Sequence, residues 1–185
     1  MNDFNPNRRK FVMSGAALAT GALILPSSVW AQGSVSPDIR ELSLFNAHTS
    51  ESASECYFDG SGYVPSALKV FNHLCRDHRQ NKSIDLDPRL YDQLVAIKHI
   101  LKTDKRCVVL SGYRSEETNN MLRKRGGGQA LKSFHITGQA IDFTIEGIPL
   151  KRIRQAAMSL KAGGVGFYPK SNFIHIDTGP VRYWG

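Results

Sequence analysis

Apolar residues recur every three or four positions in several segments of the chain, which is the spacing of one buried face of a helix. Two further segments carry helix start signals. Asp87 followed by Pro88 is a typical first turn, and Ser115 is suited to cap the helix that follows it. We therefore expect helices over residues 65–79, 87–101, 116–124 and 150–161.

Shorter apolar runs, some of them alternating with polar residues, predict strands. The segment 169–172 has the composition of a turn between two such runs. The expected strands cover residues 42–49, 55–58, 107–111, 140–145, 164–168 and 173–177, after a loose entry segment over 32–40. Because helices come early and strands come late, with hairpins between strands, the pattern predicts an α+β fold with an antiparallel sheet.

The N-terminal segment, residues 1–31, has the layout of a bacterial export signal. A basic start contains Arg8 and Arg9, and a weakly apolar stretch follows over 12–25. This stretch is shorter than the roughly 20 residues that a membrane helix needs. Small residues before the end of the segment predict cleavage near Ala31. The structural alternative is a basic arm on a buried helix.

The paired arginines resemble the signal read by the twin-arginine translocase, which exports proteins that are already folded. We therefore expect this translocase as a partner during export. No lipid-attachment pattern occurs in the sequence. The mature chain, residues 32–185, is accordingly expected in the periplasm without a stable membrane anchor.

The composition is that of an ordinary globular protein, with 41% hydrophobic and 22% charged residues, and it excludes collagen, coiled coils and wholesale disorder. The net charge of +8 suits nucleic acid, an anionic polymer or a merely solvated basic surface. Export argues against nucleic acid and for the anionic cell wall. Cys56, Cys75 and Cys107 have no C-x-x-C spacing, so we expect buried thiols, no thiolate zinc site and no essential disulfide.

Two of the predicted strands have polar side chains opposite an apolar face. On the strand 140–145 the bulky apolar residues share one face, which we expect to join the core, and Asp142 lies on the other face. On the strand 173–177, His175 and Asp177 likewise lie opposite two isoleucines. Both strands are thus expected to direct ionisable side chains at a cleft.

A third ionisable residue, His135, lies in the loop before the first of these strands, where Gly138 lets the chain turn. If the two strands are neighbours, His135, Asp142 and His175 can meet. Two imidazoles and one carboxylate form a catalytic zinc set that leaves the fourth coordination position open for water. The structural alternatives are hydrogen-bonded histidines and an aspartate in a turn or a salt bridge.

Four separated motifs resemble those of the zinc peptidases that act on peptidoglycan. The segment 133–142 matches S-x-H-x-x-G-x-A-x-D, the segment 111–115 matches S-G-Y-R-S, and 163–168 and 173–177 match the closing elements. This superfamily includes D,D-carboxypeptidases, D-Ala-D-Ala dipeptidases, murein endopeptidases and the Hedgehog signalling fold. The whole chain, export signal included, resembles the murein endopeptidases of this superfamily.

The resemblance implies a zinc metallopeptidase domain over residues 32–185 with one Zn²⁺ per chain. The implied fold is a small antiparallel sheet with helices packed on one side, as in Hedgehog and the D,D-peptidases. The implied metal ligands are His135, Asp142 and His175.

The resemblance also implies roles for residues around the metal. Arg114 would contact the substrate and stabilise the developing oxyanion, and Tyr113 and Ser133 would help to bind the substrate. The structural alternatives are an ion pair between Arg114 and a buried carboxylate, and capping of the loop by Ser133.

The general base is less directly implied. Many members of the superfamily carry a glutamate or histidine two or three residues before the last metal-binding histidine, where this chain has Asn172 and Phe173. Neither of these side chains can take up a proton. Asp177 is the nearest carboxylate on the same strand face as His175, so we expect it to accept a proton from the metal-bound water. The alternative is a structural aspartate that caps the turn at Thr178.

The expected reaction is metal-assisted hydrolysis of peptide cross-links in peptidoglycan, which opens the murein mesh for wall growth. The resemblance favours the link between two meso-diaminopimelate residues, followed by the link between D-Ala and meso-diaminopimelate. One alternative is a D,D- or L,D-carboxypeptidase, which needs a closed pocket with a cation for the terminal carboxylate. The other is a non-catalytic wall-binding module, which is expected to have lost a metal ligand.

Overall fold

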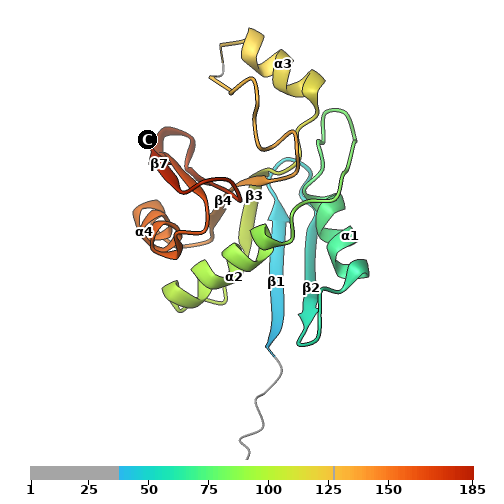
Figure 1. The fold of residues 1–185 in the computed structure, drawn as a ribbon, viewed down its shortest axis with the longest axis vertical. Helices are drawn as coiled ribbons and strands as arrows, with labels where there is room; N and C mark the ends of the chain where they lie inside the picture. The colour runs from blue at the N-terminus through green and yellow to red at the C-terminus, as the bar shows by residue number, and fades with distance from the viewer. Residues whose placement is uncertain (1–37, 127) are drawn as a thin grey trace, which may run out of the picture. The chain divides into compact units, whose positions relative to one another are not determined.

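The computed structural model describes residues 38–126 and 128–185 (Figure 1). The predicted export signal, residues 1–31, and the first residues of the predicted catalytic domain lie outside the described residues. Their boundaries therefore stay predictions. Within the described part of the chain, no helix combines the length and the apolar character that a membrane crossing requires.

The described chain has the mixed α+β architecture that the sequence predicts, although two strands precede the first helix. The strands are β1 (Ile39–Asn46), β2 (Ser52–Asp59), β3 (Cys107–Ser111), β4 (Ala140–Ile145), β5 (Gly164–Tyr168), β6 (Phe173–Asp177) and β7 (Arg182–Trp184). The helices are α1 (Pro65–Leu74), α2 (Arg89–Leu101), α3 (Glu116–Lys124), α4 (Leu150–Leu160) and the short 3₁₀ helix η1 (Pro169–Ser171).

The sheet is larger than predicted and is mixed. Its seven strands lie in the order β2-β1-β3-β4-β6-β5-β7. β1 pairs with β3 in parallel, and so does β5 with β7, whereas the other neighbours are antiparallel. The prediction of a small antiparallel sheet is therefore wrong. Parallel neighbours need a long crossover connection, and the pattern within each strand does not reveal a partner that lies so far along the chain.

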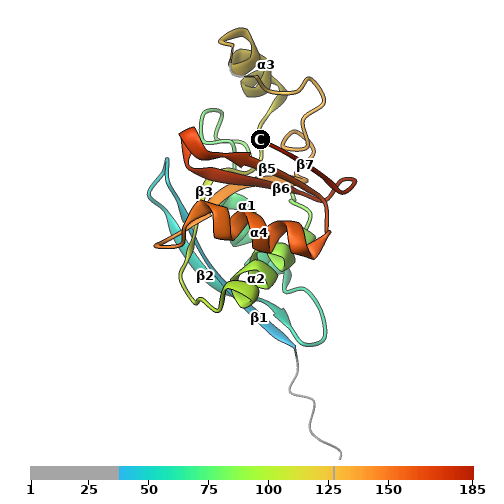
Figure 2. The same cartoon turned by 90° about the vertical axis from the view of Figure 1, so that its left-hand side faces the viewer.

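The hydrophobic core lies between the sheet and the helices α1, α2 and α4, which cover one face of it (Figure 2). Leu90 and Leu94 of α2 and Ile153 of α4 are fully buried in this core, together with Ile141 and Phe143 of β4. The predicted apolar face of β4 is thus the core face. The opposite face of β4 and β6 carries the ionisable side chains, as the alternation of residues along a strand requires.

Of the predicted elements, α3, β3, β4, β5 and β6 match in both bounds, and α1, α2 and α4 match in one. β1 and β2 each begin three residues before the predicted strand, so residues 39–40 of the predicted loose entry segment belong to β1. β1 ends at Asn46, earlier than predicted, because this residue starts a turn. Its side-chain oxygen accepts hydrogen bonds from the backbone N–H groups of His48 (2.8 Å) and Thr49 (3.2 Å). α1 also ends early, at Leu74, whose carbonyl accepts a hydrogen bond from Asn46 Nδ2 (2.7 Å). A local side-chain bond to the backbone therefore ends β1, and the same asparagine satisfies the last carbonyl of α1 from a distant part of the chain.

The three cysteines are free thiols. Cys75 and Cys107 are fully buried, as predicted, and burial raises the pKa of each thiol to about 12. Cys56 is only half-buried, so the prediction of a buried thiol is wrong in degree there, and its Sγ lies 3.4 Å from the carbonyl oxygen of Phe58. The two core cysteines act as small apolar residues rather than as nucleophiles.

Candidate metal centre and cleft

Three predicted site residues converge on the polar face of the sheet. His175 Nδ1 lies 2.8 Å from Asp142 Oδ1, and His135 Nε2 lies 3.3 Å from both of these atoms. All three side chains are buried, with exposures of 3% for His135, 7% for Asp142 and 9% for His175. The three atoms are therefore close enough together to bind one cation.

The pairing of β4 with β6 brings two of these residues together. Asp142 and His175 are direct cross-strand partners, so both side chains leave the same face of the sheet. Their strand neighbours Ile141 and Ile176 are also paired and are fully buried in the core on the opposite face. A shift of the register by one residue would reverse both faces, so the core packing also fixes the position of these two side chains.

The loop before β4 supplies the third residue. The backbone N–H of Arg114 donates a hydrogen bond to the His135 carbonyl (3.1 Å), which ties this loop to the segment after β3. Gly138 then turns the chain toward β4 with a φ of 70°. A Cβ at this position would lie 2.9 Å from the Asp85 carbonyl oxygen, so both the backbone angle and the close approach require glycine.

Each imidazole has an outer partner that fixes its tautomer. His135 Nδ1 lies 2.7 Å from the carbonyl oxygen of Gly112, which can only accept, so Nδ1 carries the proton and Nε2 presents a lone pair to the centre. His175 Nε2 lies 3.0 Å from Asp177 Oδ2, which leaves His175 Nδ1 for the centre. Outer acceptors of this kind are typical of metal-binding histidines. Two imidazole nitrogens and one carboxylate oxygen form a donor set that suits zinc.

Electrostatic interactions favour the ionised form of Asp142. Burial alone would raise its pKa, but the two imidazoles outweigh this effect and hold the pKa of the carboxyl well below its usual range. Burial lowers the pKa of His135, which favours its neutral form. Burial would also lower the pKa of His175, but its hydrogen bonds to Asp142 and Asp177 raise it. Since metal and protons compete for such groups, a cation that binds these three residues would do so in a pH-dependent way.

The structure gives Asp177 an enclosed position that argues against the predicted role of general base. Asp177 is fully buried and lies on the Nε2 side of His175, whereas the converging atoms lie on the Nδ1 side. Arg182 donates to both carboxylate oxygens, at 3.0 and 2.6 Å, and the backbone N–H groups of Gly164 and Gly179 each donate to Oδ1 at 3.0 Å. A general base must reach the proton that it accepts, and this carboxylate is engaged on every side.

These contacts explain the pKa of Asp177 and support the structural alternative considered above. Burial would raise the pKa of its carboxyl, but the hydrogen bonds from His175, Arg182 and the two backbone N–H groups lower it well below the usual range. The bond from Gly179 caps the turn after β6. Asp177 thus connects His175 to the turn and to Arg182.

Arg114 lies in the cleft beside the cluster and is only 8% exposed. Its guanidinium has long contacts to Ser111 Oγ (3.2 Å), Asn119 Oδ1 (3.4 Å) and Asp142 Oδ2 (3.7 Å). The last contact is an ion pair with a buried carboxylate, as in the structural alternative, but it is longer than a charge-assisted hydrogen bond. Burial lowers the pKa of Arg114, and Asp142 partly opposes this effect. A guanidinium has five N–H donors, so donors remain for an anionic or carbonyl group in the cleft.

The two other predicted substrate-binding residues differ in position. Ser133 lines the cleft, and its Oγ accepts a long hydrogen bond (3.4 Å) from the backbone N–H of His135. Both alternatives for Ser133, contact with a ligand and capping of the loop, are compatible with this position. Tyr113 is half-buried, packs against the hydrophobic core and is not among the residues that line the cleft. The structure therefore does not support Tyr113 as a substrate contact.

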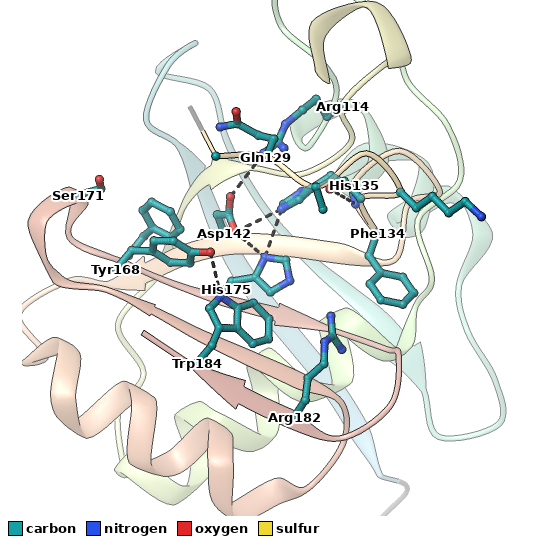
Figure 3. Close-up of a pocket in the computed structure, with 15 residues that line it drawn as sticks. Arg114, Gln129, Phe134, His135, Asp142, Tyr168, Ser171, His175, Arg182 and Trp184 are labelled. Carbon is teal, nitrogen blue, oxygen red and sulfur yellow. Dashed lines mark hydrogen bonds and ion pairs between the residues drawn. The ribbon is translucent and has the colours of Figure 1, made fainter. Parts of the chain in front are cut away.

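The cleft over the cluster has a volume of about 810 Å³ (Figure 3). Sequence reasoning missed several of its lining residues. They are the basic residues Lys132 and Arg182, the aromatic residues Phe134, Tyr168, Phe173 and Trp184, and Gln129. Tyr168 lies in a motif that the sequence analysis singled out, but nothing in the motif indicated a direction for its side chain. Trp184 and Arg182 belong to β7, which is too short to show a periodic pattern.

The chain is similar over its full length to bacterial proteins that are named as peptidoglycan endopeptidases. The family model described as Peptidase_M15_2, peptidoglycan L,D-endopeptidase MepK, matches residues 34–184. The peptidoglycan L,D-endopeptidase MepK of Escherichia coli strain K12 is 52% identical over 184 residues, which cover 100% of both chains. The probable peptidoglycan L,D-endopeptidase MepK of Haemophilus influenzae is 43% identical over 185 residues, which cover 100% of this chain and 98% of that protein.

Proposed function

Since this chain belongs to the Peptidase_M15_2 family of peptidoglycan endopeptidases, we propose that it is a zinc metallopeptidase that hydrolyses peptide cross-links of peptidoglycan. The observation that carries the proposal is the approach of His135 Nε2, Asp142 Oδ1 and His175 Nδ1 to within 4.8 Å of one another in a cleft. This donor set is that of a catalytic zinc site, which has three protein ligands and a free position.

We propose that the preferred substrate is a cross-link between two meso-diaminopimelate residues. The relatives are named L,D-endopeptidases. A meso-diaminopimelate residue has one L-centre and one D-centre, so a bond between two such residues can join an L-centre to a D-centre. The link between D-Ala and meso-diaminopimelate joins two D-centres and is proposed as the second substrate.

The side chains of the cleft have distinct roles in this reaction. Zinc, when bound by the three ligands, would acidify a water molecule and polarise the scissile carbonyl. Arg114 donates hydrogen bonds to the carbonyl oxygen as it gains negative charge, because a partly desolvated guanidinium interacts strongly with such a charge. Asp177 keeps His175 in the ligating tautomer and does not carry the proton.

Incubation of the zinc-loaded protein with purified muropeptide dimers tests this function. We expect the dimer linked between two meso-diaminopimelate residues to be cut into monomers, as followed by mass spectrometry, and a chelator to abolish the cut. Added Zn²⁺ should restore it. A cut that persists after the chelator has removed the metal would contradict the zinc-dependent mechanism. Release of a terminal residue alone would indicate a carboxypeptidase, and binding without hydrolysis would indicate a wall-binding module.

Export provides a separate test, because peptidoglycan lies outside the cytoplasm. We propose that residues 1–31 direct the protein to the periplasm through the twin-arginine translocase. The double substitution Arg8→Lys with Arg9→Lys should trap the precursor in the cytoplasm, as measured by cell fractionation. Lys10→Arg, which keeps the arginine pair, is the matched control. A normal periplasmic yield of the double variant would indicate the general secretory route instead.

A further inference from the structure

A row of four residues crosses the polar face of the sheet at the metal centre. Asp142 pairs with His175, His175 pairs with Gly166, and Gly166 pairs with Trp184, on the neighbouring strands β4, β6, β5 and β7. Directly paired residues share a face of the sheet, so the indole of Trp184 lies on the same face as the ligand His175. The centroids of these two rings are 5.3 Å apart.

Gly166 leaves the space that the indole occupies. A Cβ at this position would lie 2.6–2.8 Å from three ring atoms of Trp184, so any side chain at residue 166 would displace the tryptophan. Trp184 therefore lies across β5 and reaches toward the centre of the cleft (Figure 3).

Tyr168 approaches the same place from further along β5. It is two residues from Gly166, so its side chain leaves the same face of the sheet. Its ring stacks on Phe173, its cross-strand partner, with a centroid distance of 4.5 Å and an interplanar angle of 20°. The stack restricts the ring, and Figure 3 shows the hydroxyl directed toward His175 and Trp184.

The hydrogen bond between Trp184 and Tyr168 directs the phenol proton of Tyr168 away from the indole. Trp184 Nε1 lies 2.9 Å from the Tyr168 hydroxyl oxygen. An indole N–H can only donate, so the phenol oxygen accepts this bond and its own O–H proton points elsewhere. Among the described residues, no acceptor for that proton is found. A phenol that accepts a hydrogen bond is also polarised to donate a stronger one.

We propose that Tyr168 is a further catalytic residue of this peptidase. Its O–H donates a hydrogen bond to the scissile carbonyl oxygen as negative charge develops there. In the sheet, β4 and β6, which carry Asp142 and His175, lie between β5 and the end of β3, so Tyr168 and Arg114 reach the substrate from opposite sides of the metal ligands. Trp184 is a positioning residue that acts through Tyr168. This inference rests on the proposed peptidase function.

The substitution Tyr168→Phe tests the proposal, because it removes the hydroxyl and keeps the stacked ring. We expect kcat/KM on the muropeptide dimer to fall about 10²-fold, mainly through kcat, which is the usual effect of removing one donor to an oxyanion. Zinc content and melting temperature should stay unchanged, since Tyr168 is 39% exposed and its hydroxyl is hydrogen-bonded to Trp184 rather than to a proposed metal ligand. Trp184→Phe, which removes the indole N–H together with part of the ring, should lower kcat less.

Tyr183→Phe is the matched control. Tyr183 lies next to Trp184 on β7, but its hydroxyl donates to the Met158 carbonyl (3.1 Å) and it does not line the cleft. Its substitution should leave both kinetic constants unchanged.

The outcomes separate this inference from the proposed function. A wild-type protein that cuts no muropeptide dimer would overturn the function itself. If the wild type is active and Tyr168→Phe keeps more than about a third of kcat, the catalytic role is wrong. A rise in KM with unchanged kcat would also overturn it, because Tyr168 would then bind the substrate as strongly as the transition state. Loss of zinc from the variant would do the same, by showing a structural role.

Discussion

His135→Ala should abolish cross-link hydrolysis and leave less than one equivalent of zinc in the purified protein. The substitution removes one of the three proposed ligands from a centre in which His135 Nε2 lies 3.3 Å from both of the other proposed ligand atoms. Loss of an outer partner of a ligand typically lowers metal affinity or activity by about 10–100-fold, so loss of the ligand itself should exceed that range. Elemental analysis and turnover of the muropeptide dimer, measured on the same sample, provide the test.

The fold should survive this substitution better than the activity does. The core between the sheet and the helices is built from apolar side chains that do not depend on a metal, unlike the core of a zinc finger. His99→Ala is the matched control, because His99 is exposed in the last turn of α2. We expect this control to keep full metal content and full activity. Full metal content with full activity in His135→Ala would exclude the proposed centre.

Asp177→Asn should weaken metal binding by about 10–100-fold and lower the melting temperature. An asparagine has only one acceptor oxygen, whereas Asp177 accepts hydrogen bonds from His175, Arg182 and two backbone N–H groups. Each buried group left without a partner costs about 1–3 kcal/mol. Part of the charge pair with Arg182 is screened by solvent, because the Arg182 side chain is 40% exposed. At saturating Zn²⁺ we expect most of the turnover to return.

This result would differ from the one expected of a general base. Loss of a base lowers turnover by about 10²–10⁴-fold and leaves metal affinity and melting temperature nearly unchanged. Titration with Zn²⁺, thermal unfolding and turnover at saturating metal together distinguish the two roles. Asp104→Asn, at an exposed position between α2 and β3, controls for the change of charge. If turnover stays a hundredfold low at saturating Zn²⁺ with normal stability, Asp177 is the base after all.

The role of Asp177 shows where sequence reasoning stops. The alternation of residues along β6 correctly predicts that His175 and Asp177 share a face of the sheet. It does not predict which nitrogen of His175 turns toward which neighbour. That choice depends on Arg182, on the backbone N–H of Gly179 in the turn after β6 and on the backbone N–H of Gly164 at the start of β5, and the alternation along one strand does not reveal these contacts.

In the fold as well, local patterns predict the position of a strand but not its partner. Strands β3 to β6 are bounded by turn residues and have clear apolar faces, so their positions follow from short windows of sequence. The parallel pairing of β1 with β3 and of β5 with β7 depends on how the chain crosses over between them. Since Trp184 reaches Tyr168 only through the second of these pairings, the aromatic part of the cleft could not be derived from the strand patterns alone.

The two histidines proposed as metal ligands differ in the kind of atom that supports them. His135 is held by a main-chain oxygen, that of Gly112, whereas His175 is held by the side chain of Asp177. A point mutation can replace a carboxylate but cannot delete a peptide carbonyl. In a directed-evolution experiment, zinc affinity should therefore be adjustable in small steps through residues 177 and 182, with His135 as the invariant anchor. A single substitution can thus change the acceptor that supports His175, whereas the acceptor that supports His135 belongs to the main chain and is kept in any substitution.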